Sequence, residues 1–195
     1  MFEAIIAFAG GYLLGSIPFA YLVTRTFGLG DIRQVGSGNV GATNVLRTGN
    51  KLAAALTLVG DVGKGVAAVL IAKQFGEFAT LGAALGAFTG HIFPVGLRFK
   101  GGKGLATFIG ILFALNLPVA LLVCATWITV ALVSQISSLS ALVAAAAAPL
   151  FMLSFGPWRY AVAAAVLAAL IFLTHRENIR RLIAGEEPRI GAKEA

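Results

Sequence analysis

The stretch Gly90-His-Ile-Phe-Pro-Val-Gly-Leu-Arg-Phe-Lys-Gly-Gly-Lys-Gly104 lies between two long apolar runs and is both basic and rich in glycine. Because glycine has no Cβ, the backbone N–H groups of Gly101, Gly102 and Gly104 can converge on one anion. Lys103 adds positive charge, and the apolar run that follows offers a helix N-terminus. The stretch predicts an anion cradle at a membrane surface; the alternative is a basic turn that only sets the membrane topology.

The chain around this stretch has the composition of a polytopic membrane protein. Of its 195 residues, 58% are hydrophobic and 12% are charged, whereas about a quarter of an ordinary soluble domain is charged. Lys and Arg outnumber Asp and Glu by 15 to 8, but they fall in short loops between apolar runs and not along one soluble face. We therefore expect membrane lipid around the protein and no nucleic-acid partner.

Three apolar runs before Gly104 predict membrane spans, each close to the ~20 residues that a bilayer requires. They cover about 4–24, 52–72 and 79–97. The first is interrupted at residues 15–18 by Gly-Ser-Ile-Pro, where we expect a kink. In the third, small residues repeat at helical spacing, which favours tight packing between spans.

The region from Gly104 to His175 is almost free of charge, and polar or proline-containing breaks at about 116–118, 135–138 and 156–157 leave four apolar segments. The first of these is shorter than a usual span, so it either re-enters the membrane or forms half of a kinked span. If the polar motifs serve one site, they lie on one side, and an even number of crossings separates Gly104 from His175. Two crossings give five spans and four give seven; we predict seven.

The positive-inside rule then gives the orientation. Only Lys73 and Arg159 fall on the opposite side, and Lys64 lies within the membrane, so the N-terminus is expected outside and the C-terminus in the cytoplasm. The predicted cytoplasmic charges are Arg25, Arg33, Arg47, Lys51, Arg98, Lys100, Lys103, Arg176, Arg180, Arg181, Arg189 and Lys193.

These patterns predict an all-α integral membrane protein with seven transmembrane helices. We expect a single polytopic membrane domain over residues 1–195. Its cytoplasmic motif loops are expected at about 25–51, 98–104, 135–138 and 175–195.

Two ionisable residues lie inside the second predicted span. Asp61 and Lys64 are one helical turn apart, close enough to pair on one face. Charges at that depth are costly and need a partner. The pair therefore either lines a polar site or is a mutually neutralised structural pair, and the sequence leaves both interpretations open.

The long polar loop between the first two spans contains Gly36-Ser-Gly-Asn-Val-Gly-Ala-Thr-Asn-Val-Leu-Arg47. Its glycines formally match a dinucleotide fingerprint, but the loop has no strand-turn-helix setting, so we reject that interpretation. Neutral hydrogen-bonding groups beside one guanidinium suit a polyol phosphate; alternatively, the Asn and Ser residues only form turns. The candidate residues are Gly36, Ser37, Gly38, Asn39, Thr43, Asn44 and Arg47.

A third polar motif, Thr174-His-Arg-Glu-Asn-Ile-Arg-Arg-Leu182, continues from the last span. His175 and Asn178 share one helical face, where the imidazole can act as a base or donor and the amide can orient a hydroxyl. Glu177 is expected to pair with Arg181. The alternative is a basic helix end that only anchors the last span.

The turn at the second break, Gln135-Ile-Ser-Ser-Leu-Ser140, is expected on the same side, where Ser137 and Ser138 can add hydroxyls, although such turns are usually only turns. No His/Cys/Asp cluster has metal-ligand spacing, and neither Lys64 nor Lys103 is followed by the Ser or Thr of a Walker A motif. We expect no metal and no cofactor.

Taken together, the motifs that begin at Gly36, Gly90 and His175 closely resemble those of the bacterial acyl-phosphate:glycerol-3-phosphate acyltransferase family, in order and over nearly the whole chain. The resemblance implies a seven-span enzyme of the bacterial inner membrane with its active site at the cytoplasmic face. Such an enzyme transfers a fatty acyl group from acyl phosphate to the sn-1 hydroxyl of glycerol-3-phosphate. The products are lysophosphatidic acid and phosphate, in the first step of phospholipid synthesis.

The resemblance also implies partners and roles. The partners are acyl phosphate, glycerol-3-phosphate and membrane lipid, with the oligomeric state left open, a monomer included. In the first motif, the resemblance makes Ser37 and Arg47 the functional residues. In the second, the glycines and Lys103 form the phosphate-binding loop. In the third, His175 and Asn178 are functional and Glu177 is structural.

Acyl phosphate already carries a good leaving group, so positioning and electrostatic stabilisation can suffice for the transfer. We expect direct attack by the glycerol hydroxyl, with its proton passing to His175 or to the donor phosphate, and no acyl-enzyme at Ser37. The alternative function is a small transporter for a phosphorylated metabolite that uses the same cationic loops. A purely structural scaffold would leave the polar loops unexplained.

Overall fold

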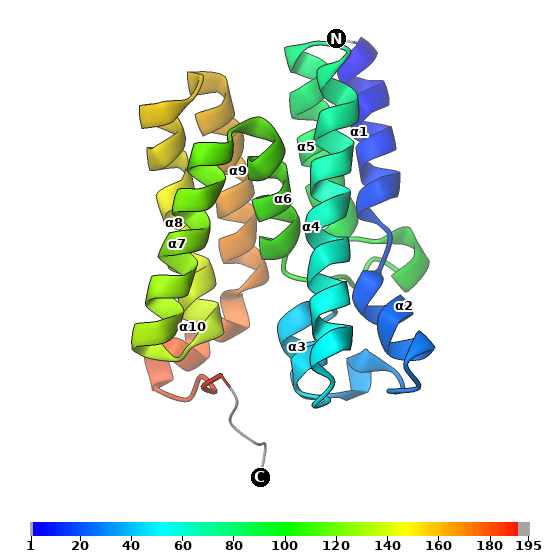
Figure 1. The fold of residues 1–195 in the computed structure, drawn as a ribbon, viewed down its shortest axis with the longest axis vertical. Coiled ribbons are helices and arrows are strands. Elements are labelled where there is room, and N and C mark those ends of the chain that lie inside the picture. Colours follow the sequence, from blue (N-terminus) through cyan, green and yellow to red (C-terminus); the bar gives the residue numbers. More distant parts are fainter. Residues whose placement is uncertain (1, 191–195) are drawn as a thin grey trace. The chain divides into compact units, whose positions relative to one another are not determined.

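The computed structural model describes residues 2–190, and all regular elements in that range are helices (Figure 1). This confirms the all-α prediction; Lys193, one of the predicted cytoplasmic charges, lies outside the described residues. The elements are α1 (Phe2–Gly15), α2 (Phe19–Thr26), η1 (Ile32–Gln34), α3 (Ala42–Leu46), α4 (Lys51–Lys73), α5 (Glu77–Ile92), η2 (Val95–Leu97), α6 (Leu105–Leu115), α7 (Leu117–Ser134), α8 (Ser137–Phe155), α9 (Trp158–Thr174) and α10 (Arg176–Ala184).

Five helical segments within the described range are long and apolar enough to cross a membrane, or six if α9 and α10, bent by 63° at their junction, count as one span. The first of them contains both α1 and α2, which are separated at the predicted Gly-Ser-Ile-Pro break. The four apolar segments predicted after Gly104 are the helices α6 to α9, and α6 is the short one, as expected. The total of seven spans and the orientation of the termini stay predictions.

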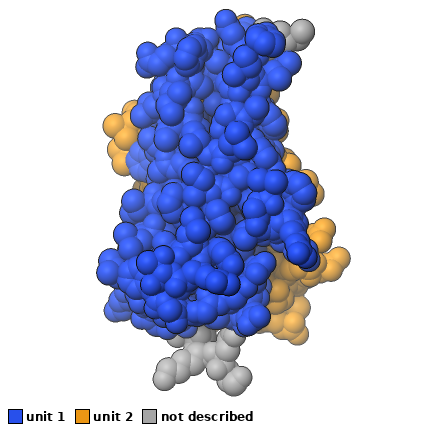
Figure 2. Space-filling model, turned by 90° about the vertical axis from the view of Figure 1, so that its right-hand side faces the viewer, with its two compact units in different colours: residues 1–114, 193–195 blue, residues 115–192 orange. Residues whose placement is uncertain are grey.

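The described chain divides into two compact units, one ending at Ala114 and the other beginning at Leu115 (Figure 2). We call them unit 1 and unit 2. Unit 1 holds α1 to α6 with η1 and η2, and unit 2 holds α7 to α10. The single polytopic domain stays a prediction.

Glycines let the helices of unit 1 approach one another closely. A Cβ at Gly86 of α5 would overlap the backbone carbonyl of Phe8 in α1, and one at Gly15 of α1 would overlap the carbonyl of Ala87 in α5. On α6, a Cβ at Gly110 would meet the backbone of α4. Close backbone contact replaces the hydrophobic driving force that helices lack in lipid. The predicted tight packing between spans is therefore confirmed for α5.

In unit 2, α8 packs between α7 and α9. Its buried face is made largely of alanines, including the fully buried Ala144, Ala145 and Ala148. Asn116 begins α7 by accepting a hydrogen bond from the N–H of Val119 (3.1 Å), and its amide donates to the carbonyl of Phe155 at the end of α8 (2.8 Å). The residue that breaks the apolar pattern thus also joins two helix ends.

Candidate active site

The polar loop between α2 and α4 folds around the buried side chain of Asn44. Its Nδ2 donates to the carbonyl oxygens of Ile32 (3.1 Å), Val35 (2.9 Å) and Asn39 (3.0 Å). Its Oδ1 accepts from both the backbone N–H (3.3 Å) and the hydroxyl (3.4 Å) of Ser37. Because these bonds engage both ends of the amide, Asn44 holds the shape of the loop, and its contact with substrate stays a prediction.

Gly36 brings Arg47 next to this loop. Its φ of +53° is in the left-handed region, and a Cβ there would lie 2.8 Å from both Cδ and Nη1 of Arg47 and 2.7 Å from Oδ1 of Asn44. A larger residue would be strained and would push the guanidinium away. The structure therefore gathers Gly36, Ser37, Asn44 and Arg47, four of the predicted site residues.

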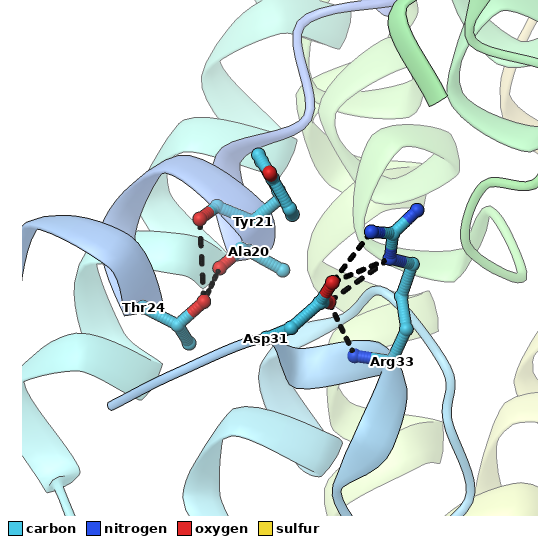
Figure 3. A network of polar contacts seen from close by, with 5 residues as sticks. All are labelled: Ala20, Tyr21, Thr24, Asp31 and Arg33. Carbon is cyan, nitrogen blue, oxygen red and sulfur yellow. Dashed lines mark hydrogen bonds and ion pairs between the residues drawn. The ribbon is translucent and has the colours of Figure 1, made fainter. Parts of the chain in front are cut away.

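A charged network lies at the beginning of the same loop (Figure 3). Asp31 accepts from the backbone N–H (3.0 Å) and the Nε (2.9 Å) of Arg33, and the hydrogen bonds from Arg33 lower the pKa of Asp31 to about 2. The Arg33 guanidinium also lies 5.3 Å from the ring centroid of Tyr21 in α2. This network was not foreseen, and it attaches η1 to α2.

The basic glycine-rich loop differs from the predicted cradle. The N–H groups of Gly101 and Gly102 donate to the carbonyls of Ile92 and His91 at the end of α5 (both 3.1 Å), so they are not directed at a ligand. Glycine is needed here because a Cβ on Gly101 would overlap the His91 carbonyl. At Gly104, φ is +94° and a Cβ would overlap the Phe88 ring. The prediction of converging free N–H groups is thus corrected for Gly101 and Gly102.

The predicted helix N-terminus is present, since α6 begins at Leu105, two residues after Lys103. The first N–H groups of a helix lack intrahelical partners, and the helix dipole makes this end positive. In unit 1, this end and the Lys103 side chain are the parts of the motif suited to an anion.

The two motif loops of unit 1 touch each other. A Cβ on Gly102 would lie 2.7 Å from the carbonyl oxygen of Val40, which belongs to the first loop. Val40 and Leu97 also share one buried apolar cluster with Ile32. The expectation that these two polar motifs lie together is therefore confirmed.

His175 and Asn178, the candidate pair of unit 2, are both buried. Nδ1 of His175 lies 2.8 Å from the carbonyl oxygen of Ile171. A carbonyl only accepts, so Nδ1 carries the proton, and in the neutral ring Nε2 carries the lone pair. This arrangement prepares Nε2 to take up a proton.

Glu187 holds Asn178 in place, and the sequence motifs did not reveal it. Oε1 of Glu187 accepts from Nδ2 of Asn178 (2.5 Å) and from the hydroxyl of Ser138 (2.7 Å), while Oε2 accepts from Nε of Arg181 (2.7 Å). Burial alone would raise the pKa of Glu187, but the hydrogen bonds from Ser138, Asn178 and Arg181 lower it below its ordinary value. The carboxylate thus stays ionised and links two of the predicted site residues.

This network corrects the predicted pairing of Glu177 with Arg181. Arg181 binds Glu187 instead, and Glu177 lies within ion-pair distance of Arg180 (3.2 Å). Gly185, at φ +74°, ends α10 and reverses the chain. The N–H of Ile190 then donates to the carbonyl of Gln135 (2.7 Å), which fixes the returning segment.

The remaining predicted site residues lie on the same loops. Gly38 (φ +67°), Asn39 and the exposed Thr43 belong to the first loop, and the half-buried Ser137 begins α8. Unit 1 thus contains the candidates from the first two motifs, and unit 2 contains Ser137, Ser138, His175 and Asn178.

Comparison with known proteins gives one consistent family. A family model described as glycerol-3-phosphate acyltransferase matches residues 5–185. A glycerol-3-phosphate acyltransferase of Nitrobacter winogradskyi is 57% identical over 192 residues, which is 98% of each chain. One of Cereibacter sphaeroides is 59% identical over 184 residues, covering 94% of this chain and 88% of that protein.

The similar solved structures are of the same family of acyltransferases. The glycerol 3-phosphate form of PlsY (YgiH), an integral membrane glycerol 3-phosphate acyltransferase, has a TM-score of 0.91 and 41% identity over 96% of both chains. Its lysophosphatidic acid form has a TM-score of 0.89 and 39% identity, covering 96% of this chain and 95% of that one. The fold is therefore that of a helical integral membrane enzyme. This chain belongs to the glycerol-3-phosphate acyltransferase family.

Proposed function

We propose that this protein transfers a fatty acyl group from acyl phosphate to the sn-1 hydroxyl of glycerol-3-phosphate, forming lysophosphatidic acid and inorganic phosphate. The PlsY structures, one a glycerol 3-phosphate form and the other a lysophosphatidic acid form, support this acceptor and product. We further propose seven spans, an external N-terminus and an active site at the cytoplasmic face of the bacterial inner membrane. The distribution of Lys and Arg supports this orientation.

The environment of Ser37 supports direct attack on an activated donor such as acyl phosphate. Its hydroxyl lies 3.4 Å from Oδ1 of Asn44, an amide oxygen that is too weak a base to take up the proton. This contact therefore does not activate Ser37 as a nucleophile. A donor that already contains a good leaving group needs no covalent intermediate, and acyl phosphate is such a donor.

In the reaction we propose, the sn-1 oxygen attacks the acyl carbonyl carbon directly. The bond between that carbon and the phosphate oxygen breaks, and phosphate leaves with the electron pair. We assign the hydroxyl proton to Nε2 of His175 or to the departing phosphate. Asn178 orients the hydroxyl, and Arg47 and Lys103 bind phosphate groups, because both cations suit charge-assisted hydrogen bonds to phosphate oxygens.

Purified protein in detergent, given glycerol-3-phosphate with either palmitoyl phosphate or palmitoyl-CoA, tests this function. We expect lysophosphatidic acid and phosphate from palmitoyl phosphate alone, without added metal. Product from palmitoyl-CoA only would refute the donor assignment, and no product from either donor in folded protein would favour the transporter. An acyl adduct on Ser37 after incubation with donor alone would refute direct attack.

A further inference from the structure

Three ionisable side chains meet inside unit 1, outside the loops to which the reaction was assigned. Nζ of Lys64 lies 2.9 Å from Oδ1 of Asp61, and Nδ1 of His91 lies 3.5 Å from the same oxygen. The side chains of Asp61 and Lys64 are each 3% exposed, and that of His91 is 6% exposed. The sequence showed the first two as a pair on α4, whereas His91 comes from α5.

The network contacts two backbone segments. Nζ of Lys64 donates to the carbonyl of Ile17 (2.9 Å), within the break that separates α1 from α2. At the other end, the His91 ring lies against Gly102, where a Cβ would overlap Nε2, and the His91 carbonyl accepts the Gly102 N–H (3.1 Å). Gly102 directly precedes Lys103. The network therefore lies between a helix break and the bend that leads to the candidate phosphate-binding lysine.

Stability alone does not explain such a network. Burying an ion pair costs so much desolvation that apolar replacements of similar size are often neutral or stabilising. What a buried pair does provide is a fixed geometry, because removing one partner leaves an uncompensated charge. Of the two interpretations left open by the sequence, the structure shows the mutually neutralised pair. The pair also borders a small pocket together with Val40, Gly101 and Gly102, and a polar site there stays a prediction.

We infer that Asp61, Lys64 and His91 form a positioning network for Lys103. The network keeps the Gly101–Gly102 bend in register with the end of α5 and with Val40 of the first loop, and so determines where Lys103 presents its ammonium group to a substrate phosphate. This inference rests on the proposed function for the identity of that phosphate. The three residues are positioning residues, since their side chains are buried.

The test compares paired and single charge removal in the full-length protein. Asp61→Asn and Lys64→Met each leave one buried charge without a partner, so both should lower Tm. The double variant D61N/K64M removes both charges, and we expect its Tm to return toward that of the unsubstituted protein. Its kcat/KM should nevertheless stay reduced by about 10- to 100-fold, since a displacement of about 1 Å can cost that much.

Thr57→Val is the matched control on α4. Thr57 is fully buried and donates to the Ala53 carbonyl within its own helix (2.8 Å), so losing its hydroxyl should affect Tm without changing kcat/KM. His91→Asn can still place a donor near Asp61, whereas His91→Leu cannot, and we expect the first to retain more activity. A double variant that recovers both Tm and kcat/KM would show that the network is only structural and would overturn the inference.

A second readout does not depend on turnover. We expect an amine-reactive reagent, quantified by mass spectrometry, to modify Lys103 at a rate changed several-fold in D61N/K64M, while modification of Lys51 at the start of α4 stays the same. Unchanged Lys103 modification would also overturn the inference. If the unsubstituted protein shows no acyl transfer, the proposed function fails, and the modification rates still decide whether the network positions Lys103.

Discussion

Replacing Glu187 by glutamine removes one negative charge from unit 2 while keeping the size of the side chain. The carboxylate accepts from Ser138 and Asn178 through one oxygen and from Arg181 through the other. A glutamine has only one acceptor oxygen, which can replace Oε1 and accept from Ser138 and Asn178. Its NH₂ group would then lie where Oε2 accepts from Arg181, and two donors cannot bond to each other. Because the Glu187 side chain is only 6% exposed, water cannot easily replace the lost partner.

The expected loss follows from the bond to Arg181. A hydrogen bond to a charged group contributes about 1.5–3 kcal/mol, so E187Q should reduce the unfolding free energy of unit 2 by about 2 kcal/mol. Both tryptophans, Trp127 and Trp158, belong to unit 2, so their fluorescence during thermal unfolding in detergent reports on it. Acyl transfer should also slow, because Nδ2 of Asn178 would then donate to a neutral amide oxygen instead of a carboxylate and would be held less firmly.

The pH dependence gives a sharper test. The pKa of Glu187 is lower in the folded protein than its ordinary value, so its contribution to stability is present above that value and is lost as pH falls through the folded pKa. Tm should therefore fall on acidification below about pH 4.3, the ordinary Glu pKa, and it should fall less in E187Q. Glu186→Gln, the same change at an exposed neighbouring position, is the control. This reasoning would be refuted if E187Q and the unsubstituted protein had the same Tm and if their Tm values fell equally on acidification.

Three further predictions concern the loops of unit 1. Gly102→Ala should lower folded yield and activity because its Cβ overlaps the His91 ring, whereas Gly96→Ala, which meets nothing within 4 Å, should be tolerated; equal yields would contradict this. Asn44→Leu leaves several loop groups without partners and should cost at least about 2 kcal/mol, checked by faster limited proteolysis of the loop. Arg47→Lys keeps the charge but loses the planar fork, so KM for glycerol-3-phosphate should rise; an unchanged KM for both substrates would remove Arg47 from phosphate binding.

Local and composition-based features were predictable from the sequence. Apolar runs had to become helices, because a bilayer leaves no other partner for their backbone groups. The break before Phe19 and the start of α7 at Asn116 follow from proline geometry and from side-chain capping, which involve only neighbouring residues. The motif residues were also found, since polar groups are conspicuous between apolar spans.

The partners of those residues were decided only by the tertiary structure. Asp61 and Lys64 are visible as a pair because one helix places them a turn apart, but His91 reaches them from another helix, and no local rule specifies that register. Glu187 reaches Asn178 only because Gly185 reverses the chain after α10, a signal that predicts a turn but not the contact beyond it. The glycine N–H groups likewise bind the end of α5 instead of an open cradle. Sequence determines which groups can bond, whereas packing brings distant groups together and so decides which bonds form.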